Sequence, residues 1–62
     1  MKFAIGDLVT FHFPLSERVI NGYVEKIGYD EKVKVIIFNK RGLEAGSYWF
    51  HPNNKHLKKV SE

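Results

Sequence analysis

The apolar stretches of this 62-residue chain are all short, and glycine, proline, asparagine or aspartate residues typical of turns separate them. Within the stretches, residues tend to alternate between the two faces of an extended chain, and no window sustains the spacing of an amphipathic helix. Residues 8–13, LVTFHF, illustrate this, because Val9, Phe11 and Phe13 fall on one face. We therefore expect strands and no helix.

Five segments are expected to be strands: residues 8–13, 18–27, 32–38, 47–50 and 57–60. Gly22 lies inside the second segment, where a glycine usually marks a bulge, a sharp bend or a close approach of backbones. Residues 39–46, NKRGLEAG, are expected to be a long loop. Short strands spaced about 8–12 residues apart indicate an all-β barrel or sandwich, and this length favours a five-stranded barrel formed by one domain, residues 1–62.

A domain of this length buries only about 60% of its unfolded surface, so almost every large apolar side chain is needed for the core. There is no cysteine, which excludes disulfides and thiolate metal sites. Stability must come from packing or from a partner subunit, so a homodimer is one possibility. The expected core consists of Ile5, Val9, Phe11, Val24, Ile27, Val33, Val35, Ile37, Tyr48, Phe50, Leu57 and Val60.

The net charge of +3 is unevenly distributed along the chain. Residues 1–31 carry three basic and five acidic side chains, whereas residues 32–62 carry seven basic and two acidic ones. This asymmetry is open to two interpretations: solubilising charge that the fold mixes on one surface, or a cationic strip for phosphates or an acidic partner. The apolar run before Asp7 is too short for a signal sequence or a membrane span, so a cytoplasmic protein without membrane contact is expected.

No enzymatic activity, cofactor or metal site is expected. Ser16 and Ser47 lack the surroundings of a nucleophile elbow, and a barrel this small has little room for a cleft that excludes water. His12, His51 and His56 have no cysteine or carboxylate cluster with which to complete the four ligands that zinc prefers.

The stretches AIGDLVTF, NGYVEKI, KVIIF and SYWFHPNNKHLKKV resemble a small SH3-like barrel of the KOW/Tudor-like kind. In such barrels a φ-G-D-x-V opening leads into the first strand, and a glycine-x-valine lies in the second. The matching residues are Ile5, Gly6, Asp7 and Val9, and then Gly22 and Val24. The resemblance implies a short 3₁₀ turn, at HPNNKH, before the last strand. The chain also resembles short uncharacterised proteins of Bacillus-type bacteria and their phages.

Tyr48, Trp49 and Phe50 are consecutive in an expected strand, so they cannot all face the core. In one phase Tyr48 and Phe50 point inward and Trp49 points to solvent or a groove; in the other, Trp49 alone is buried. The first phase is favoured because it places two aromatic rings in a core that needs them.

Two functions remain open. The first is a protein-interaction module that takes a peptide in an aromatic groove around Tyr23, Tyr29 and Trp49, or pairs with a partner through an open strand edge. The alternative is nucleic-acid binding with little sequence readout, in which a basic strip neutralises phosphates beside Tyr29, Phe38 and Trp49. The strip would contain Lys32, Lys34, Lys40, Arg41, Lys55, Lys58 and Lys59.

Overall fold

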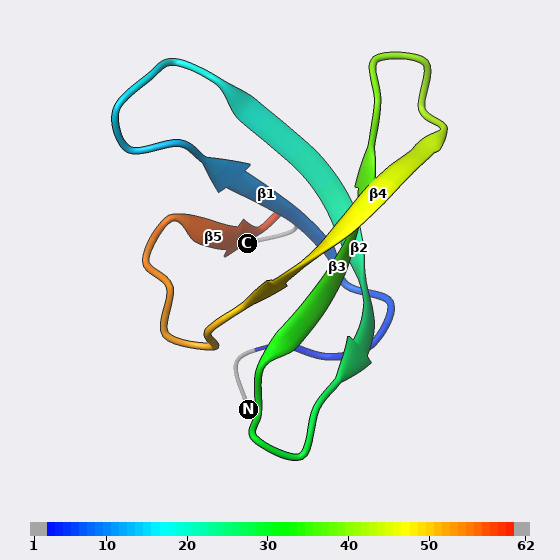
Figure 1. The fold of residues 1–62 in the computed structure, drawn as a ribbon, viewed down its shortest axis with the longest axis vertical. Helices are drawn as coiled ribbons and strands as arrows, with labels where there is room; N and C mark the ends of the chain where they lie inside the picture. Colours follow the sequence, from blue (N-terminus) through cyan, green and yellow to red (C-terminus); the bar gives the residue numbers. More distant parts are fainter. Residues whose placement is uncertain (1–2, 61–62) are drawn as a thin grey trace.

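A computed structural model describes residues 3–60, which form a single antiparallel sheet of five strands (Figure 1). The strands are β1 (Leu8–His12), β2 (Val19–Ile27), β3 (Val33–Phe38), β4 (Glu44–Phe50) and β5 (Leu57–Lys59). Their order across the sheet is β4-β3-β2-β1-β5. The all-β prediction is confirmed, and no helix within the described residues is long and apolar enough to cross a membrane.

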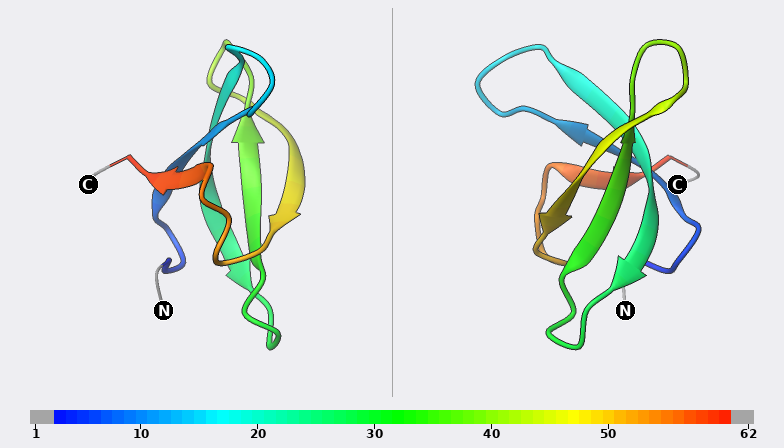
Figure 2. Two further views of the ribbon diagram at one scale, coloured as in Figure 1. Left: turned by 90° about the vertical axis from the view of Figure 1, so that its left-hand side faces the viewer. Right: turned by 45° about the vertical axis from the view of Figure 1, so that its right-hand side comes forward.

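The sheet is strongly twisted but is not closed into the barrel that the sequence predicts. β1 pairs with both β2 and β5, whereas β4 and β5 are the two edges and do not pair with each other. In the left view of Figure 2, β5 runs at a steep angle to β3, and β4 lies on the opposite side of β3. β5 has three residues, and they pair with Val9–Phe11 of β1.

The 3₁₀ turn expected between the last two strands is not confirmed. Residues 51–56 form two successive turns: the Asn54 N–H donates to the His51 carbonyl (3.1 Å), and the Leu57 N–H donates to the Asn54 carbonyl (3.2 Å). The Asn54 side chain accepts from the His56 N–H at 2.9 Å, which fixes the second turn. An asparagine oxygen commonly supports turns in this way.

The two hairpin loops at opposite ends of β3 have the same backbone design. In residues 28–32 the Gly28 N–H donates to the Lys32 carbonyl, and in residues 39–43 the Asn39 N–H donates to the Leu43 carbonyl. The fourth residue of each loop has a positive φ, 68° at Glu31 and 79° at Gly42. The long loop predicted for residues 39–46 is therefore wrong at its end, because β4 already begins at Glu44 and contains a bulge at Gly46.

β2 is the strand that bends the sheet. A Cβ atom on Gly22 would lie 2.1 Å from the Ile36 carbonyl oxygen, so the close backbone approach expected at this glycine is present. Farther along, the register with β3 shifts between Val24 and Lys26, which leaves Glu25 as the extra residue of a bulge. Because of this bulge, Val24 and Ile27 both face the core although they are three residues apart.

The core lies on the inner face of the sheet and agrees in most positions with the expected one. Ile5, Tyr48 and Val60 were predicted wrongly: Ile5 is in a turn, Val60 follows the last strand, and Tyr48 faces inward where no strand covers it. The sequence also gave no sign that Ile36 is buried on the outer face. The buried apolar residues are Phe3, Val9, Val24, Val33, Val35, Ile36, Ile37 and Leu57, and Phe11, Ile20, Ile27 and Phe50 pack against the inner cluster.

Candidate functional site

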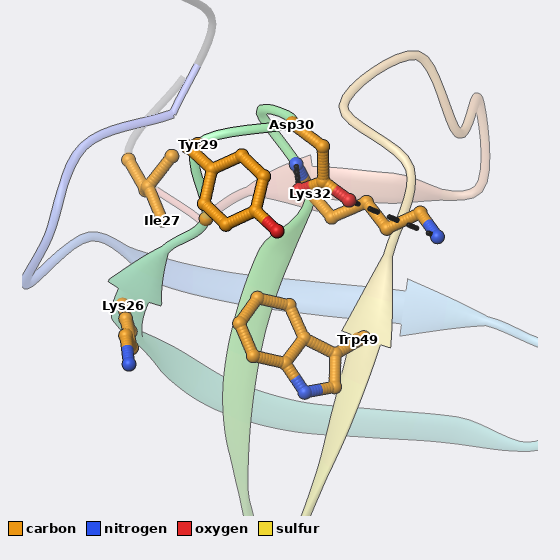
Figure 3. Close-up of a pocket in the computed structure, with 7 residues that line it drawn as sticks. Lys26, Ile27, Tyr29, Asp30, Lys32 and Trp49 are labelled. Atoms are coloured by element: carbon orange, nitrogen blue, oxygen red, sulfur yellow. Dashed lines mark hydrogen bonds and ion pairs between the residues drawn. The ribbon is translucent and has the colours of Figure 1, made fainter.

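A hollow of the surface lies where β2 ends, beside the β2–β3 loop and the end of β4. It has a volume of about 640 Å³. Figure 3 shows the Tyr29 phenol extending from the loop toward the Trp49 indole, which comes from β4 on the far side of β3. The lining residues are Lys26, Ile27, Gly28, Tyr29, Asp30, Lys32 and Trp49.

The backbone of the β2–β3 loop determines where Tyr29 lies. The Glu31 N–H donates to the Gly28 carbonyl (2.9 Å), and the Asp30 carboxylate accepts from the Lys32 N–H (3.2 Å). These bonds close a tight turn whose tip is Tyr29 and Asp30. Tyr29 is consequently fully exposed, with its ring on the open side of the hollow.

Trp49 is positioned by strand register and by Gly28. It is opposite Lys34 of β3, and Lys34 is opposite Lys26 of β2, so these three residues share the outer face of the sheet. A Cβ atom on Gly28 would lie 3.5 Å from Cζ3 of the indole, which shows that the ring lies against the glycine backbone. The indole is 49% exposed and offers one large apolar surface to the hollow. This is the phase favoured from the sequence.

The charges around the hollow are mixed and slightly positive. Lys32 lies 3.9 Å from Asp30, and just outside the hollow Lys34 lies 3.2 Å from Glu25. Lys26 has no ion pair with any residue between 3 and 60. Of the two lysines that line the hollow, Lys26, on the β2 side, is therefore the one without a carboxylate partner among the described residues.

Of the aromatic residues predicted to form a groove, Tyr29 and Trp49 come together and Tyr23 does not line the hollow. Tyr23 lies farther along the outer face, where its ring packs on Phe38 (5.6 Å between centroids) and its hydroxyl donates to Glu44 Oε2 (3.2 Å). Desolvation, followed by the charge and hydrogen bond of Glu44 and the charge of Glu25, raises the pKa of Tyr23 above its usual 10.0.

The basic residues predicted to form a strip are spread over the molecule. Lys32 lines the hollow and Lys34 is next to it, but Lys40 and Arg41 lie in the β3–β4 loop at the opposite end of β3. Lys58 and Lys59 belong to β5 at one edge of the sheet, and Lys59 lies 3.5 Å from Asp7. Three of the predicted cations, Lys32, Lys34 and Lys59, thus have carboxylate neighbours.

Four lining residues were not predicted as site residues from the sequence: Lys26, Ile27, Gly28 and Asp30. The segment GYDEK is recognisable as a turn, but nothing in its pattern indicates that Trp49 lies across from it. That proximity depends on the pairing of β3 with β2 and β4. Within residues 3–60, no three histidine, aspartate or glutamate side chains come together as a possible metal site.

No protein-family model, no curated protein and no solved structure matches this chain.

Proposed function

We propose that this protein is a small, non-enzymatic binding module that recognises a segment of another protein through the hollow between Tyr29 and Trp49. The observation that supports this most is the placement of two exposed aromatic rings on one hollow by two different hairpins. Tyrosine and tryptophan dominate the energetics of protein interfaces because they offer large, rigid surfaces that end in a polar group.

The partner that fits is an extended acidic peptide with a bulky apolar side chain. The apolar side chain would pack between the Tyr29 phenol and the Trp49 indole, and a neighbouring carboxylate would pair with Lys26, the lysine of the hollow that has no ion pair among the described residues. Since the hollow contains two lysines and one aspartate, an acidic segment complements its charge and a basic one does not.

The edge of β4 offers a second means of holding the same peptide. β4 is paired only with β3, and the half of the strand around Trp49 has no charged residue or proline to block a further strand. An extended peptide could add main-chain hydrogen bonds along this edge while its side chain enters the hollow. A second copy of the chain could use the same edge, which would make a homodimer.

We also propose that the sheet is an open form of the SH3-like barrel of the KOW/Tudor-like kind. The pairing of β1 with both β2 and β5 supports this, because it brings the last strand back beside the first, as barrel closure requires. The absence of cysteine is compatible with the reducing cytoplasm of a bacterial host, where either a cellular or a phage protein would act.

The experiment is selection from a displayed peptide library, followed by isothermal titration calorimetry of the parent chain and its variants with the selected peptides. Trp49 fluorescence is followed only in chains that keep Trp49, because it is the single tryptophan of the sequence. We expect acidic peptides with a large apolar residue, and Trp49→Ala or Tyr29→Ala should weaken binding about tenfold or more. Tyr48→Ala is the matched control, because Tyr48 is 58% exposed on the other face of the same strand.

Several outcomes would contradict the proposal. Equal binding by the Trp49→Ala and Tyr48→Ala variants would exclude the hollow as the site. Salt-sensitive quenching by single-stranded RNA or DNA, without any selected peptide, would instead favour nucleic-acid binding. A dimer detected by sedimentation and lost in the Trp49→Ala variant would identify a second copy as the occupant.

A further inference from the structure

A second cleft, of about 380 Å³, lies at the other end of the β2–β3 pair. There the β2–β3 ladder ends at Asn21 opposite Phe38, and β2 continues past it through Ile20 and Val19. The β1–β2 and β3–β4 loops extend beyond this point at the upper end of the molecule in Figure 1. The residues that line the cleft are Arg18, Val19, Ile20, Asn21, Phe38, Asn39 and Lys40.

The charge of this cleft is entirely positive. Arg18 and Lys40 are the charged residues that line it, and neither has an ion pair within residues 3–60. This distinguishes the cleft from the Tyr29–Trp49 hollow, where an aspartate accompanies the lysines. The Arg18 guanidinium lies 5.1 Å from the centre of the Phe13 ring, which holds it by a cation–π contact rather than by a carboxylate.

Asn39 adds a neutral donor to the lining of this cleft. Its Oδ1 accepts from the Arg41 N–H (2.9 Å) and the Leu43 N–H (3.1 Å). Because the oxygen is used by the loop, the side-chain NH₂ is left to donate to a ligand. Phe38, whose ring packs on Tyr23, and Val19 provide apolar surface in the same cleft.

We propose that this cleft binds a phosphate monoester attached to a planar ring, which is the chemistry of a nucleoside monophosphate. The phosphate lies between Arg18 and Lys40 and accepts from the Asn39 amide, and the ring packs on Phe38 and Val19. A monoester carries a charge of about −1.5 to −2 at neutral pH, which two cations match, whereas a phosphodiester carries about half of that. The proposal is independent of peptide binding at the Tyr29–Trp49 hollow.

Such a monophosphate can be a free nucleotide or the 5′-phosphorylated end of a strand, and the experiment separates the two. The ¹⁵N-labelled chain is titrated with AMP, with adenosine, and with a short single-stranded oligonucleotide bearing either a 5′-phosphate or a 5′-hydroxyl. We expect AMP to shift the amide signals of Asn21, Asn39 and Lys40, and adenosine to leave them unchanged. If the natural ligand is the end of a nucleic acid, the 5′-phosphorylated oligonucleotide should bind more tightly than AMP. If the natural ligand is a free nucleotide, AMP should bind at least as tightly as that oligonucleotide.

Arg18→Ala and Lys40→Ala should each weaken AMP binding about tenfold, as expected for loss of a charged hydrogen bond. The matched controls are Lys55→Ala and Lys58→Ala, which remove the same charge elsewhere. Arg18→Ala can also lower stability, because it removes the contact with the Phe13 ring. In that case the AMP affinity of Lys40→Ala, a change at the tip of a loop, tests the site. Equal binding of adenosine and AMP, equal and detectable binding of both oligonucleotides, equal loss in the control variants, or no shift with any monophosphate would overturn the proposal.

Discussion

Gly22 is the residue that the bend of β2 depends on most. Its Cα faces the Ile36 backbone so closely that a methyl group would overlap the carbonyl oxygen and also lie 2.9 Å from Cγ1 of Val35. The obstacle is backbone in the middle of the sheet, which cannot move aside as a flexible side chain would.

Gly22→Ala should therefore destabilise the fold by about 3 kcal/mol or more, which is most of the stability that a domain of this size has. Urea denaturation followed by tryptophan fluorescence measures the change in the free energy of unfolding. Ser47→Ala, an exposed change in β4, is the control and should shift it by less than about 0.5 kcal/mol. A Gly22→Ala variant as stable as the parent protein would show that β2 does not need this bend.

Glu31 has a φ of 68°, a conformation that glycine adopts readily and other residues adopt at a cost. The equivalent position of the β3–β4 loop has Gly42, with a φ of 79°. The same backbone design thus has a favourable residue in one loop and an unfavourable one in the other.

Glu31→Gly should stabilise the protein by about 0.5–1 kcal/mol, because the relief of strain exceeds the added entropy of the unfolded chain. Gly42→Ala should have the opposite sign and a similar size. Thermal unfolding by circular dichroism measures both. If the two changes shifted the melting temperature in the same direction, the shared loop design would not be the explanation.

Tyr23 links stability to alkaline pH. Its pKa is raised in the folded protein, so the folded state keeps the phenol proton at a pH where the unfolded chain begins to lose it. The contribution of Tyr23 to stability is therefore complete below about pH 10 and is lost as the pH rises through the folded-state pKa. An ultraviolet titration of phenolate formation, compared with that of the Tyr23→Phe variant, should identify Tyr23 as a group that titrates above its usual value. A normal pKa for the tyrosine lost in that variant would contradict this.

Among the strands, β3 is covered on both faces. Val33, Val35 and Ile37 face the core, and on the outer face Ile36 is only 7% exposed beside Tyr23, its partner in register. β4 differs, because most of its side chains are exposed and it has a neighbour on one side only. β3, the strand that the β2–β3 and β3–β4 hairpins share, is therefore the part of the sheet best protected from solvent.

Amide hydrogen exchange should follow this order. We expect the slowest exchange in β2 and β3, around Val24, Val35 and Ile36, and faster exchange at the free edge of β4. A single uniform rate across all strands would show that the sheet opens only as a whole. Slow exchange of every amide in β4 would point to a covered edge, as in a dimer.

At the scale of the whole molecule, ionic interactions contribute little to stability. The three ion pairs of the described residues are at the surface, with side chains between 27% and 53% exposed. Exposed pairs of this kind contribute at most about 1 kcal/mol each and are weakened by salt.

We expect the free energy of unfolding to change by less than about 1 kcal/mol between about 50 mM and about 500 mM NaCl. Nucleotide binding at the Arg18–Lys40 cleft should weaken over the same range. Urea titrations and binding measurements at the two salt concentrations test this contrast. A large loss of stability in high salt would mean that charge pairs, rather than apolar packing, hold the sheet together.

Much of the fold follows from local patterns. Alternation and turn residues predicted five strands and no helix. The phase that leaves Trp49 on the outer face was favoured because a small core needs aromatic rings, although Tyr48, one of the two rings expected there, is exposed. Gly22 was recognisable because a glycine inside a strand needs a steric reason. These features depend on a residue and its near neighbours in the chain, which is why one sequence sufficed to find them.

Tertiary structure decided the burial of individual side chains, the openness of the sheet and the composition of the hollow, which local sequence patterns do not contain. Ile36 is buried and Tyr48 is exposed because of what neighbouring strands cover, and the sheet stays open because β5 pairs only with β1. Tyr29 meets Trp49 through the pairing of β3 with two neighbours, which no short segment encodes. The sequence by itself therefore determined where the chain extends and turns, whereas long-range strand pairing determined which side chains share a site, because contacts between distant segments depend on the arrangement of the whole sheet.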